Sequence, residues 1–323
     1  MNPPPESGPA GPTVRDIGER GVIEAIVAAA PSARNGDDAA VLLSSTPNSR
    51  AVVATDMLIE GRHFSTSWST AEEVGKKAIT ANFADIEAMG ARPVAALLAL
   101  SAPESTPVAF LRGLATGIAD RAGEYSAELV GGDVTGGDSL IVSVTAIGSL
   151  GGNRPALTLD AARHGQHVVA HGRIGWSAAG FALLERFGRD DVPEQFAELV
   201  TAHCAPSLTP GRGVVARATG ATSMTDNSDG LIVDLGVIAR RSGVGINLDS
   251  AAIAPTPLMA EAGELLDVDP WTWVLTGGED HTLLATTTGD APSGFRTVGQ
   301  VTRSESVTVD GHTPKYETGW VSF

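Results

Sequence analysis

Acidic residues beside glycines or other small residues are the part of this sequence whose types and spacing could do chemistry. They lie where we expect strands to end or helices to begin: Asp37 and Asp38 in NGDDAAV, Asp56 in VVATDMLIEG, Asp133 in LVGGDVTGG, Asp226 and Asp229 in MTDNSDGLI, and Glu279 and Asp280 in LTGGEDHTLL. The hydroxyl residues Thr55 and Ser228 lie beside Asp56 and Asp229. One such acid alone is typical of a turn or a helix N-cap, because its carboxylate accepts hydrogen bonds from nearby backbone N–H groups. Their recurrence in both halves of the chain favours a shared role as cation ligands.

The donors in these segments are hard oxygens, without clusters of histidine or cysteine. Such donors favour Mg²⁺ or Ca²⁺ over zinc, and the alternating acids of an EF-hand loop are absent. Mg²⁺, which completes its coordination shell with water and phosphate oxygens, is therefore the expected ion. Gly131 and Gly132 would let the backbone approach a bulky anion, and the helix start after SDG would offer free N–H groups to a phosphate. Asp138, Asp234 and Asp310 keep the simpler interpretation as turn or cap residues.

Asp85 adds a carboxylate in a different context, within a stretch that predicts one helix from Lys76 to Pro93. The apolar residues at helical spacing are Ala78, Ile79, Phe83, Ile86 and Met89. Asp85 sits just beside this buried face, and no basic residue lies within four positions of it. A carboxylate beside a core costs several kcal/mol unless something pairs with it, so a bound cation is the expected partner.

The elements that must position these residues alternate between helix and strand, which indicates an α+β or α/β fold. Helices are expected at 14–30, 76–93, 107–125, 176–188, 231–243 and 255–267. Strands are expected after Asp38 and within 50–61, 92–103, 127–137, 139–152, 164–175, 243–249 and 276–287, with a hairpin at 306–313 around Asp310-Gly311. We divide the chain into a disordered tail at 1–13, an N-terminal domain at 14–150 and a C-terminal domain at 151–323.

Composition limits the class of protein. A chain of 323 residues with 42% hydrophobic residues and a mean hydropathy of +0.07 is typical of a globular protein with two domains. A net charge of −16 disfavours binding to nucleic acid or anionic membranes. No apolar run approaches the roughly 20 residues of a membrane span, and the first twelve residues lack the features of a signal peptide. One cysteine, Cys204, excludes an internal disulfide and fits a cytoplasmic protein.

Taken in order, six segments resemble the thiamine-monophosphate kinases, a family of the aminoimidazole-ribonucleotide-synthetase (PurM-like) superfamily. The segments are GDDAAV, TDMLIEGRHF, KKAITANFADIEAMGA, GGDVT, DNSDGL and GGED, and the resemblance runs from Val14 to the C-terminus. It implies a PurM-like α+β fold, with an N-terminal β-sheet domain that dimerises and a C-terminal α/β sandwich domain. It also implies a homodimer that uses ATP and several Mg²⁺ ions to phosphorylate thiamine monophosphate, giving thiamine diphosphate.

The resemblance also assigns roles to individual residues. As metal ligands it implies Asp38, Thr55, Asp56, Asp85, Asp133, Asp226 and Asp229. As ATP-binding residues it implies Gly132, Asp133 and Ser228, and as substrate-binding residues His63, Glu279 and Trp320.

The sequence departs from the family pattern at some nucleotide and substrate positions. Leu159 stands where the family commonly has an arginine that reaches ATP, and Gln166 stands where it has an aspartate. Arg154 and Arg163 are candidates to replace that arginine. Ala54 stands where the family can offer a serine oxygen, so only its backbone carbonyl could serve.

The reaction that the resemblance implies needs no general base. A phosphate monoester has a second pKa of about 6, so the acceptor is mostly dianionic at pH 7 and can attack directly and in line. Two alternatives remain open: another PurM-like ATP-dependent enzyme, and a protein that binds Mg–nucleotide without turnover. Selenophosphate synthetase is disfavoured, because it needs a reactive residue near the N-terminus and Cys204 is the only cysteine.

Overall fold

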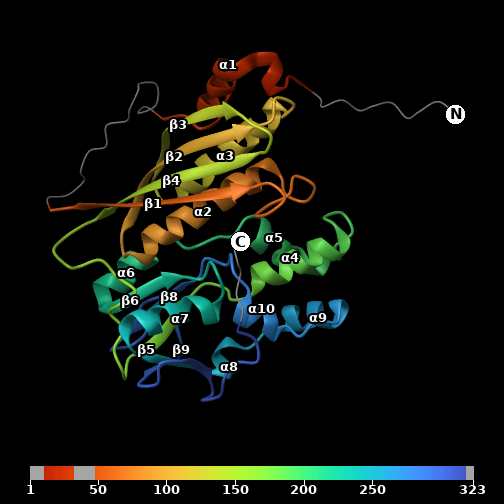
Figure 1. The fold of residues 1–323 in the computed structure, drawn as a ribbon. Helices are drawn as coiled ribbons and strands as arrows, with labels where there is room; N and C mark the ends of the chain where they lie inside the picture. The colour runs from red at the N-terminus through yellow and green to blue at the C-terminus, as the bar shows by residue number, and fades with distance from the viewer. Residues whose placement is uncertain (1–10, 33–47, 318–323) are drawn as a thin grey trace.

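The computed structural model describes residues 11–32 and 48–317, which form two β-sheets with helices packed against them (Figure 1). The first sheet has the order β1-β4-β2-β3. Its strands are β1 (Arg50–Ile59), β2 (Arg92–Ala102), β3 (Glu128–Gly136) and β4 (Ile141–Leu150). β4 runs antiparallel to both β1 and β2, whereas β3 runs parallel to β2. The parallel pair requires a crossover, which α3 (Val108–Glu124) supplies.

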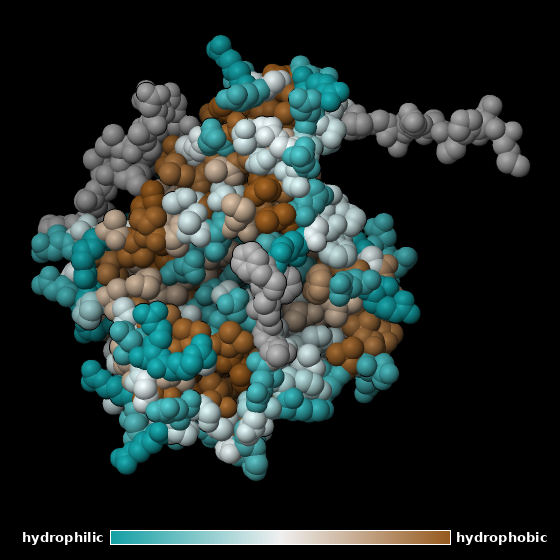
Figure 2. Space-filling model, viewed as in Figure 1, coloured by the Kyte–Doolittle hydropathy of each residue, from teal (hydrophilic) through white to brown (hydrophobic). Residues whose placement is uncertain are grey.

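Two helices cover one face of this sheet, and the described residues leave the other face, which we call the open face, exposed. α2 (Ala71–Ala88) and α3 contribute Ile79, Phe83 and Leu114 to a core that is completed by the inward residues of the strands, and α1 (Val14–Ala29) packs against α3. The open face carries apolar side chains in view of solvent, including Val53 at 62% and Met57 at 50% exposure. Figure 2 shows apolar surface over this sheet.

The second sheet has the order β10-β7-β9-β5-β8-β6. Its strands are β5 (His167–His171), β6 (Ala221–Asp226), β7 (Gly245–Leu248), β8 (Leu283–Thr287), β9 (Arg296–Thr302) and β10 (Val307–Val309). The helices of this half are α4 (Trp176–Phe187), α5 (Ala197–Cys204), α6 (Arg212–Thr219), α7 (Leu231–Ser242), α8 (Ser250–Ile253), α9 (Pro257–Leu266) and α10 (Trp271–Thr276), with a 3₁₀ turn at Glu194–Phe196. Among the described residues no helix is both long enough and apolar enough to cross a bilayer.

α2 belongs to the packing of both halves. Thirteen of its eighteen residues are buried, so it is enclosed on nearly all sides rather than amphipathic. One side packs on the first sheet, while Ala84 and Ala88 pack with Val169, Met224 and Leu283 from the second sheet. The helix that carries Asp85 therefore forms the joint between the two sheets.

A buried carboxylate fixes this joint. Glu87 of α2 is completely buried, and its two oxygens accept hydrogen bonds from the backbone N–H groups of Gly211 and Gly213, each at 2.6 Å, at the start of α6. Burial raises the pKa of Glu87 to about 7, although the two N–H donors act in the opposite direction. A side chain at Gly213 would overlap the Glu87 carbonyl oxygen, so only glycine allows this close approach.

The boundaries of α2 differ from the predicted helix at 76–93. The helix begins earlier, because Thr70 and Glu73 form a capping box in which each side chain accepts from the backbone of the other. It ends at Ala88, since Gly90 adopts a positive φ of 72° and β2 starts at Arg92.

The context of several acids also differs from the expected strand ends. Asp56 and Thr55 lie within β1, and Asp133 lies within β3, so these three residues are inside strands. Asp226 ends β6, and Ser228 and Asp229 directly precede α7, as predicted. The other predicted helices and strands that fall within the described ranges are present, whereas α5, α6, α8, α10, β6 and β9 were not predicted. The hairpin predicted at 306–313 is instead the single strand β10, which pairs in parallel with β7 and turns back only at an isolated bridge between Val309 and His312. Asp37, Asp38, the strand after them and Trp320 lie outside the described residues.

Glu87→Ala is expected to lower the free energy of unfolding by about 2–4 kcal/mol, because two buried N–H groups lose their acceptor and a cavity remains. Chemical denaturation monitored by circular dichroism measures this change. The matched control is Glu261→Ala at an exposed position of α9, where a change within about 0.5 kcal/mol is expected. Equal effects of the two substitutions would contradict a clamp at Glu87.

Candidate active site

Four carboxylates from both halves of the chain converge beside α2. Asp56 comes from β1, Asp85 from α2, Asp226 from the end of β6, and Asp229 from the turn before α7. Burial, together with the charges of Asp226 and Asp56, raises the pKa of Asp85 to about 8. Burial and the charge of Asp226 likewise raise the pKa of Asp56. Burial and the charges of Asp226 and Asp56 raise the pKa of Asp229. These mutual effects place the four side chains in one electrostatic cluster, which we call the acidic cluster.

Asp226, the most enclosed member of the acidic cluster, is held by neighbours on both of its oxygens. One accepts from Ser228 Oγ at 3.3 Å, and the other lies 2.9 Å from Nδ1 of the buried His281. Burial opposes the charged form of His281, but its hydrogen bond with Asp226 and the charge of Asp226 raise its pKa above the usual value. His281 therefore restrains Asp226 rather than neutralising the whole group.

The N-terminus of α7 is already occupied by a side chain of its own helix. Asp234 accepts hydrogen bonds from the backbone N–H groups of Asp229 and Gly230, at 3.1 and 3.0 Å. This confirms the cap role expected for Asp234. It corrects the expectation that the SDG turn offers free N–H groups to a phosphate, because two of these groups are used by Asp234.

The acidic cluster fits divalent cations by the chemistry of its donors. Hard carboxylate oxygens with raised pKa values require positive charge for full ionisation, and Mg²⁺ or Ca²⁺ prefers such oxygens. Within residues 11–32 and 48–317, however, no three acidic, histidine or cysteine side chains stand close enough to chelate one ion as they are placed. Asp38, the remaining acid expected near Asp56, lies outside the described residues.

Thr55 and Asp133 do not join the acidic cluster. In the register of the first sheet, Asp56 aligns with the buried Val144, and its backbone N–H donates to Asn82 of α2 at 3.0 Å. Asp133 aligns instead, across β2 and β4, with the exposed Met57 of β1. Thr55 lies two residues before Met57 on β1 and is also exposed, so it shares this face of the sheet. Both therefore project from the open face, opposite to Asp56.

Gly132, an expected ATP-binding residue, has a structural role within the sheet. A side chain at Gly132 would overlap the backbone carbonyl oxygen of Leu98 on β2. The close packing of β3 on β2 therefore requires glycine there, independently of any anion.

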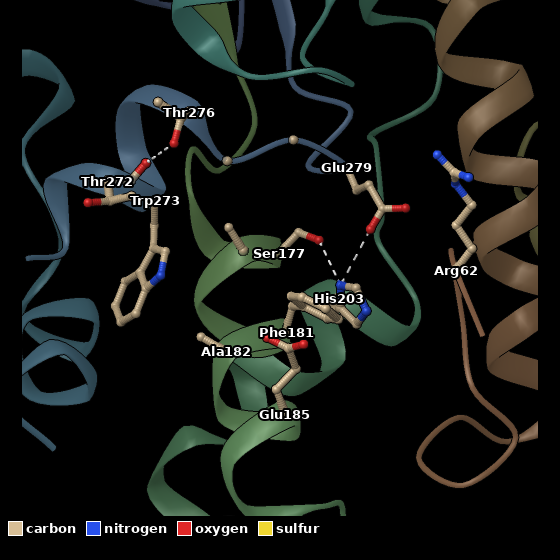
Figure 3. Close-up of a pocket in the computed structure, with 13 residues that line it drawn as sticks. Arg62, Ser177, Phe181, Ala182, Glu185, His203, Thr272, Trp273, Thr276 and Glu279 are labelled. Carbon is tan, nitrogen blue, oxygen red and sulfur yellow. Dashed lines mark hydrogen bonds and ion pairs between the residues drawn. The ribbon is translucent and has the colours of Figure 1, made fainter. Parts of the chain in front are cut away.

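Glu279 is the centre of a second polar group beside the acidic cluster. Its Oε2 accepts from Lys77 Nζ at 3.1 Å and lies 3.6 Å from His203 Nδ1, which is also 3.2 Å from Ser177 Oγ (Figure 3). Burial would raise the pKa of Glu279, but Lys77 and His203 hold it below the usual value. Burial and the charge of Lys77 lower the pKa of His203 to about 3, so this imidazole is neutral at pH 7.

This group is not a catalytic triad. In a serine–histidine–acid relay the serine and the acid contact different nitrogens of the imidazole, whereas Ser177 and Glu279 both face Nδ1 of His203. Ser177 is also buried, and its backbone N–H donates to Asp280 at 2.8 Å. Asp280 accepts a second bond, at 2.5 Å, from Gly175 N–H and so caps α4. The geometry of Ser177, His203 and Glu279 suits holding these side chains in place and does not suit activation of Ser177 as a nucleophile.

Glu279 lies where two cavities adjoin. The larger, of about 340 Å³, is walled by Phe181 of α4 and Trp273 of α10 and ends at Glu279, with Arg62 on the side towards the first sheet (Figure 3). The smaller, of about 130 Å³, is lined by Asp56, His63, Lys77, Ser228, Asp229, Glu279 and His281, among others. His63 and Glu279, two of the expected substrate residues, therefore share a cavity with members of the acidic cluster, while Trp320 lies outside the described residues.

Structural roles are found for the residues that depart from the family pattern and for one candidate to replace the missing arginine. Arg154, a candidate to replace the missing arginine, donates to the backbone carbonyls of Arg217 and Ala218 at 3.0 and 2.6 Å, away from both cavities. Leu159 packs against the core of the second sheet, and the buried Gln166 accepts from the backbone N–H of Arg163 at 2.8 Å. No lining of the two cavities includes Arg163. The arginine replacement suggested for Arg154 is therefore not supported by its placement.

Lys77, His203 and His281 were not among the site residues predicted from the sequence. For Lys77 a signal was available, because Lys77, Ala81 and Asp85 are spaced at i, i+4 and i+8 and thus share a helix face. His203 lies on a helix that was not predicted. His281 comes close to Asp226 because β6 pairs with β8.

Comparison with known proteins agrees with this architecture. Residues 36–150 match the family model "AIR synthase related protein, N-terminal domain". The chain is 65% identical over 322 residues to the thiamine-monophosphate kinase of Corynebacterium glutamicum, covering 99% of this chain and 97% of that one. It is 43% identical over 319 residues to the enzyme of that name from Mycobacterium tuberculosis, covering 97% and 93%. A solved structure of AaThiL complexed with AMPPCP and TMP matches with a TM-score of 0.76 and 30% identity, covering 96% of this chain and 98% of that chain. The expected PurM-like α+β fold is confirmed.

Asp85→Asn is expected to make the metal-free protein more stable at pH 8, by on the order of 1–3 kcal/mol. The pKa of Asp85 is raised from 3.8 to about 8 in the folded protein. The folded state therefore binds more protons than the unfolded state between these values, and the stability of the wild type falls as pH rises through this window. Thermal unfolding of both proteins in the presence of a chelator, measured from pH 4 to pH 9, should show that the stability of the variant falls less with rising pH than that of the wild type.

The same variant should gain less thermal stability from added Mg²⁺ than the wild type, because one cluster ligand is gone. Asp290→Asn, at an exposed loop position, serves as the control and should follow the wild type in both measurements. A metal-free Asp85→Asn protein that is much less stable than the wild type would instead assign Asp85 a structural role.

Proposed function

This chain belongs to the thiamine-monophosphate kinase family, and we propose that the cleft beside α2 transfers the γ-phosphoryl group of ATP directly to the phosphate of thiamine monophosphate. The observation that carries this proposal is the acidic cluster, drawn from both halves of the chain, which adjoins a pocket of a size suited to a small ligand. Relatives with the name thiamine-monophosphate kinase over the full chain support it further.

Charge is the main obstacle to this reaction, because a dianionic acceptor must approach a polyanionic donor. Asp56, Asp85, Asp226 and Asp229, with Asp38, would hold Mg²⁺ ions, which supply the positive charge that the phosphate oxygens need. The carboxylates themselves stay in place through their fixed neighbours, such as His281 beside Asp226. This arrangement aligns donor and acceptor without a covalent intermediate on the protein.

No side chain needs to act as a general base. The acceptor phosphate is already ionised at pH 7, and His203, which faces both a serine and an acid, contacts them through a single nitrogen. Direct in-line transfer is therefore the mechanism we propose, with no phosphoenzyme.

The larger cavity is the proposed site for the rings of thiamine. Phe181 and Trp273 offer apolar and aromatic surface, and Glu279 places a carboxylate at the end of the cavity, where it suits a cationic ring. The phosphate of the substrate then points into the smaller cavity, towards His63 and the acidic cluster. In this proposal Glu279 and His63 take the substrate roles that the family resemblance implies for them.

We also propose that the protein is a cytoplasmic homodimer that pairs through the open face of the first sheet. Val53, Met57 and Leu97 expose apolar surface there, and covering such a patch is favourable in water. Thr55 and Asp133 project from the same face, so dimerisation would enclose these two expected metal ligands, which lie apart from the acidic cluster.

An assay of the purified protein with ATP, Mg²⁺ and thiamine monophosphate is expected to yield thiamine diphosphate, detected by chromatography. Asp229→Asn should lower kcat by about 10²–10³-fold, because a charge that positions the phosphates is lost. Asp290→Asn should leave kcat unchanged. Tight ATP binding without any thiamine diphosphate would favour a nucleotide-binding protein, and turnover of other phosphate acceptors would favour another enzyme of the superfamily.

Met57→Lys is expected to shift the protein from dimer to monomer in sedimentation equilibrium at micromolar concentration, since a charge would be buried at the interface. Leu265→Lys places the same substitution at a similarly exposed position of α9, away from the first sheet, and should leave the dimer intact. A dimer that survives Met57→Lys, or a wild type that is monomeric, would contradict pairing through this face.

A further inference from the structure

The most unusual charge in the molecule is Lys77. All three lysines of the chain are described, and Lys77 alone is buried, with 1% of its surface exposed. Its neighbour Lys76 is partly exposed and approaches Asp120 at 3.9 Å. A buried ammonium group carries a large desolvation cost, so its position calls for a reason beyond the packing of α2.

The ammonium group of Lys77 has donors to spare. It can donate three hydrogen bonds, and in the described part of the chain it has one partner, Glu279 Oε2 at 3.1 Å. Lys77 also lines the smaller cavity together with Asp56, His63 and Asp229. A cation with unused donors therefore borders the space next to the acidic cluster.

The positive and negative ends of the Lys77–Glu279 ion pair lie at different places relative to the two cavities. Lys77 lines the smaller cavity only, whereas Glu279 lines both cavities and reaches the one walled by Phe181 and Trp273 (Figure 3). The pair thus has its positive end at the cavity of the acidic cluster and its negative end where the two cavities adjoin.

We propose that Lys77 Nζ binds the phosphate of thiamine monophosphate, so that the Lys77–Glu279 pair selects a substrate with a cationic ring at one end and a phosphate at the other. The inference rests on the proposed function and deepens it. Thiamine monophosphate carries a positive thiazolium ring and a negative phosphate, and it fits the pair with opposite charges adjacent: ring to Glu279, phosphate to Lys77. Thiamine lacks the phosphate and so lacks the second contact.

This role accounts for the burial of Lys77 in chemical terms. The acidic cluster would repel an incoming phosphate, and a fixed cation beside it offsets part of this repulsion at the acceptor. Because the ammonium group is held by Glu279 and by the buried helix, it needs little reorganisation when the phosphate arrives. Lys77 would then act as a specificity-determining residue that touches the substrate.

The test compares the binding of thiamine monophosphate with that of thiamine by isothermal titration calorimetry, with Mg²⁺ and without ATP. In Lys77→Met the ratio of the two affinities should fall by about 30–100-fold relative to the wild type, as expected for loss of a charged hydrogen bond to the phosphate. Lys77→Arg, which keeps the charge, should restore at least a third of the wild-type ratio. Lys76→Met is the matched control and should leave the ratio unchanged.

A purely structural role for Lys77 predicts a different result. If Lys77 only holds Glu279 in place, Lys77→Met weakens thiamine and thiamine monophosphate by the same factor and leaves the ratio unchanged, which would overturn the proposal. Because an unpaired, half-buried Glu279 could destabilise the protein, the Lys77→Met/Glu279→Gln double variant removes both charges together. Its ratio should also fall, and an unchanged ratio there would count equally against a phosphate contact.

Failure of this inference is distinct from failure of the proposed function. A wild type that forms thiamine diphosphate, with a ratio insensitive to Lys77, rejects the phosphate contact and retains the kinase. A wild type that forms no thiamine diphosphate rejects the proposed function and with it the premise of the inference.

Discussion

The repulsion among carboxylates that are brought together beside a buried helix is the constraint on which the rest of the structure depends. Asp85 and Asp226 come from different halves of the chain, and each raises the cost of ionising the other. Such a cluster persists only if rigid elements hold it there, because free side chains would turn away from one another. The enclosure of α2 between two sheets supplies that rigidity.

The protein uses acidic side chains in two different ways. Glu87, Asp234 and Asp280 each accept two backbone N–H groups at the beginning of a helix, so the peptide dipoles of α6, α7 and α4 stabilise them. Within residues 11–32 and 48–317, the members of the acidic cluster accept no such pair of backbone N–H groups, and their charges act on one another instead. The acids that accept helix N–H groups hold the elements around the cleft in place. The acidic cluster leaves negative charge that a bound cation can neutralise.

Much of the fold follows from local sequence, whereas the grouping of the site does not. Alternating strands and helices, the turn before α7 and the cap role of Asp234 could all be recognised from residue types and spacing. The separation of Asp133 from Asp56 could not, because the face that a strand residue occupies depends on strand register. Lys77 was missed for a related reason: a helical lysine normally faces water, and only the packing of α2 on both sides buries it.

The position of α2 has a consequence for how the molecule opens. Because the same helix completes both cores, neither sheet can lose its order while the other keeps its full packing. The two halves are therefore expected to unfold together rather than in sequence, and the backbone amides in the middle of α2 should exchange with solvent only when the entire chain unfolds. In this protein, the cooperativity of folding and the assembly of the site come from a single helix.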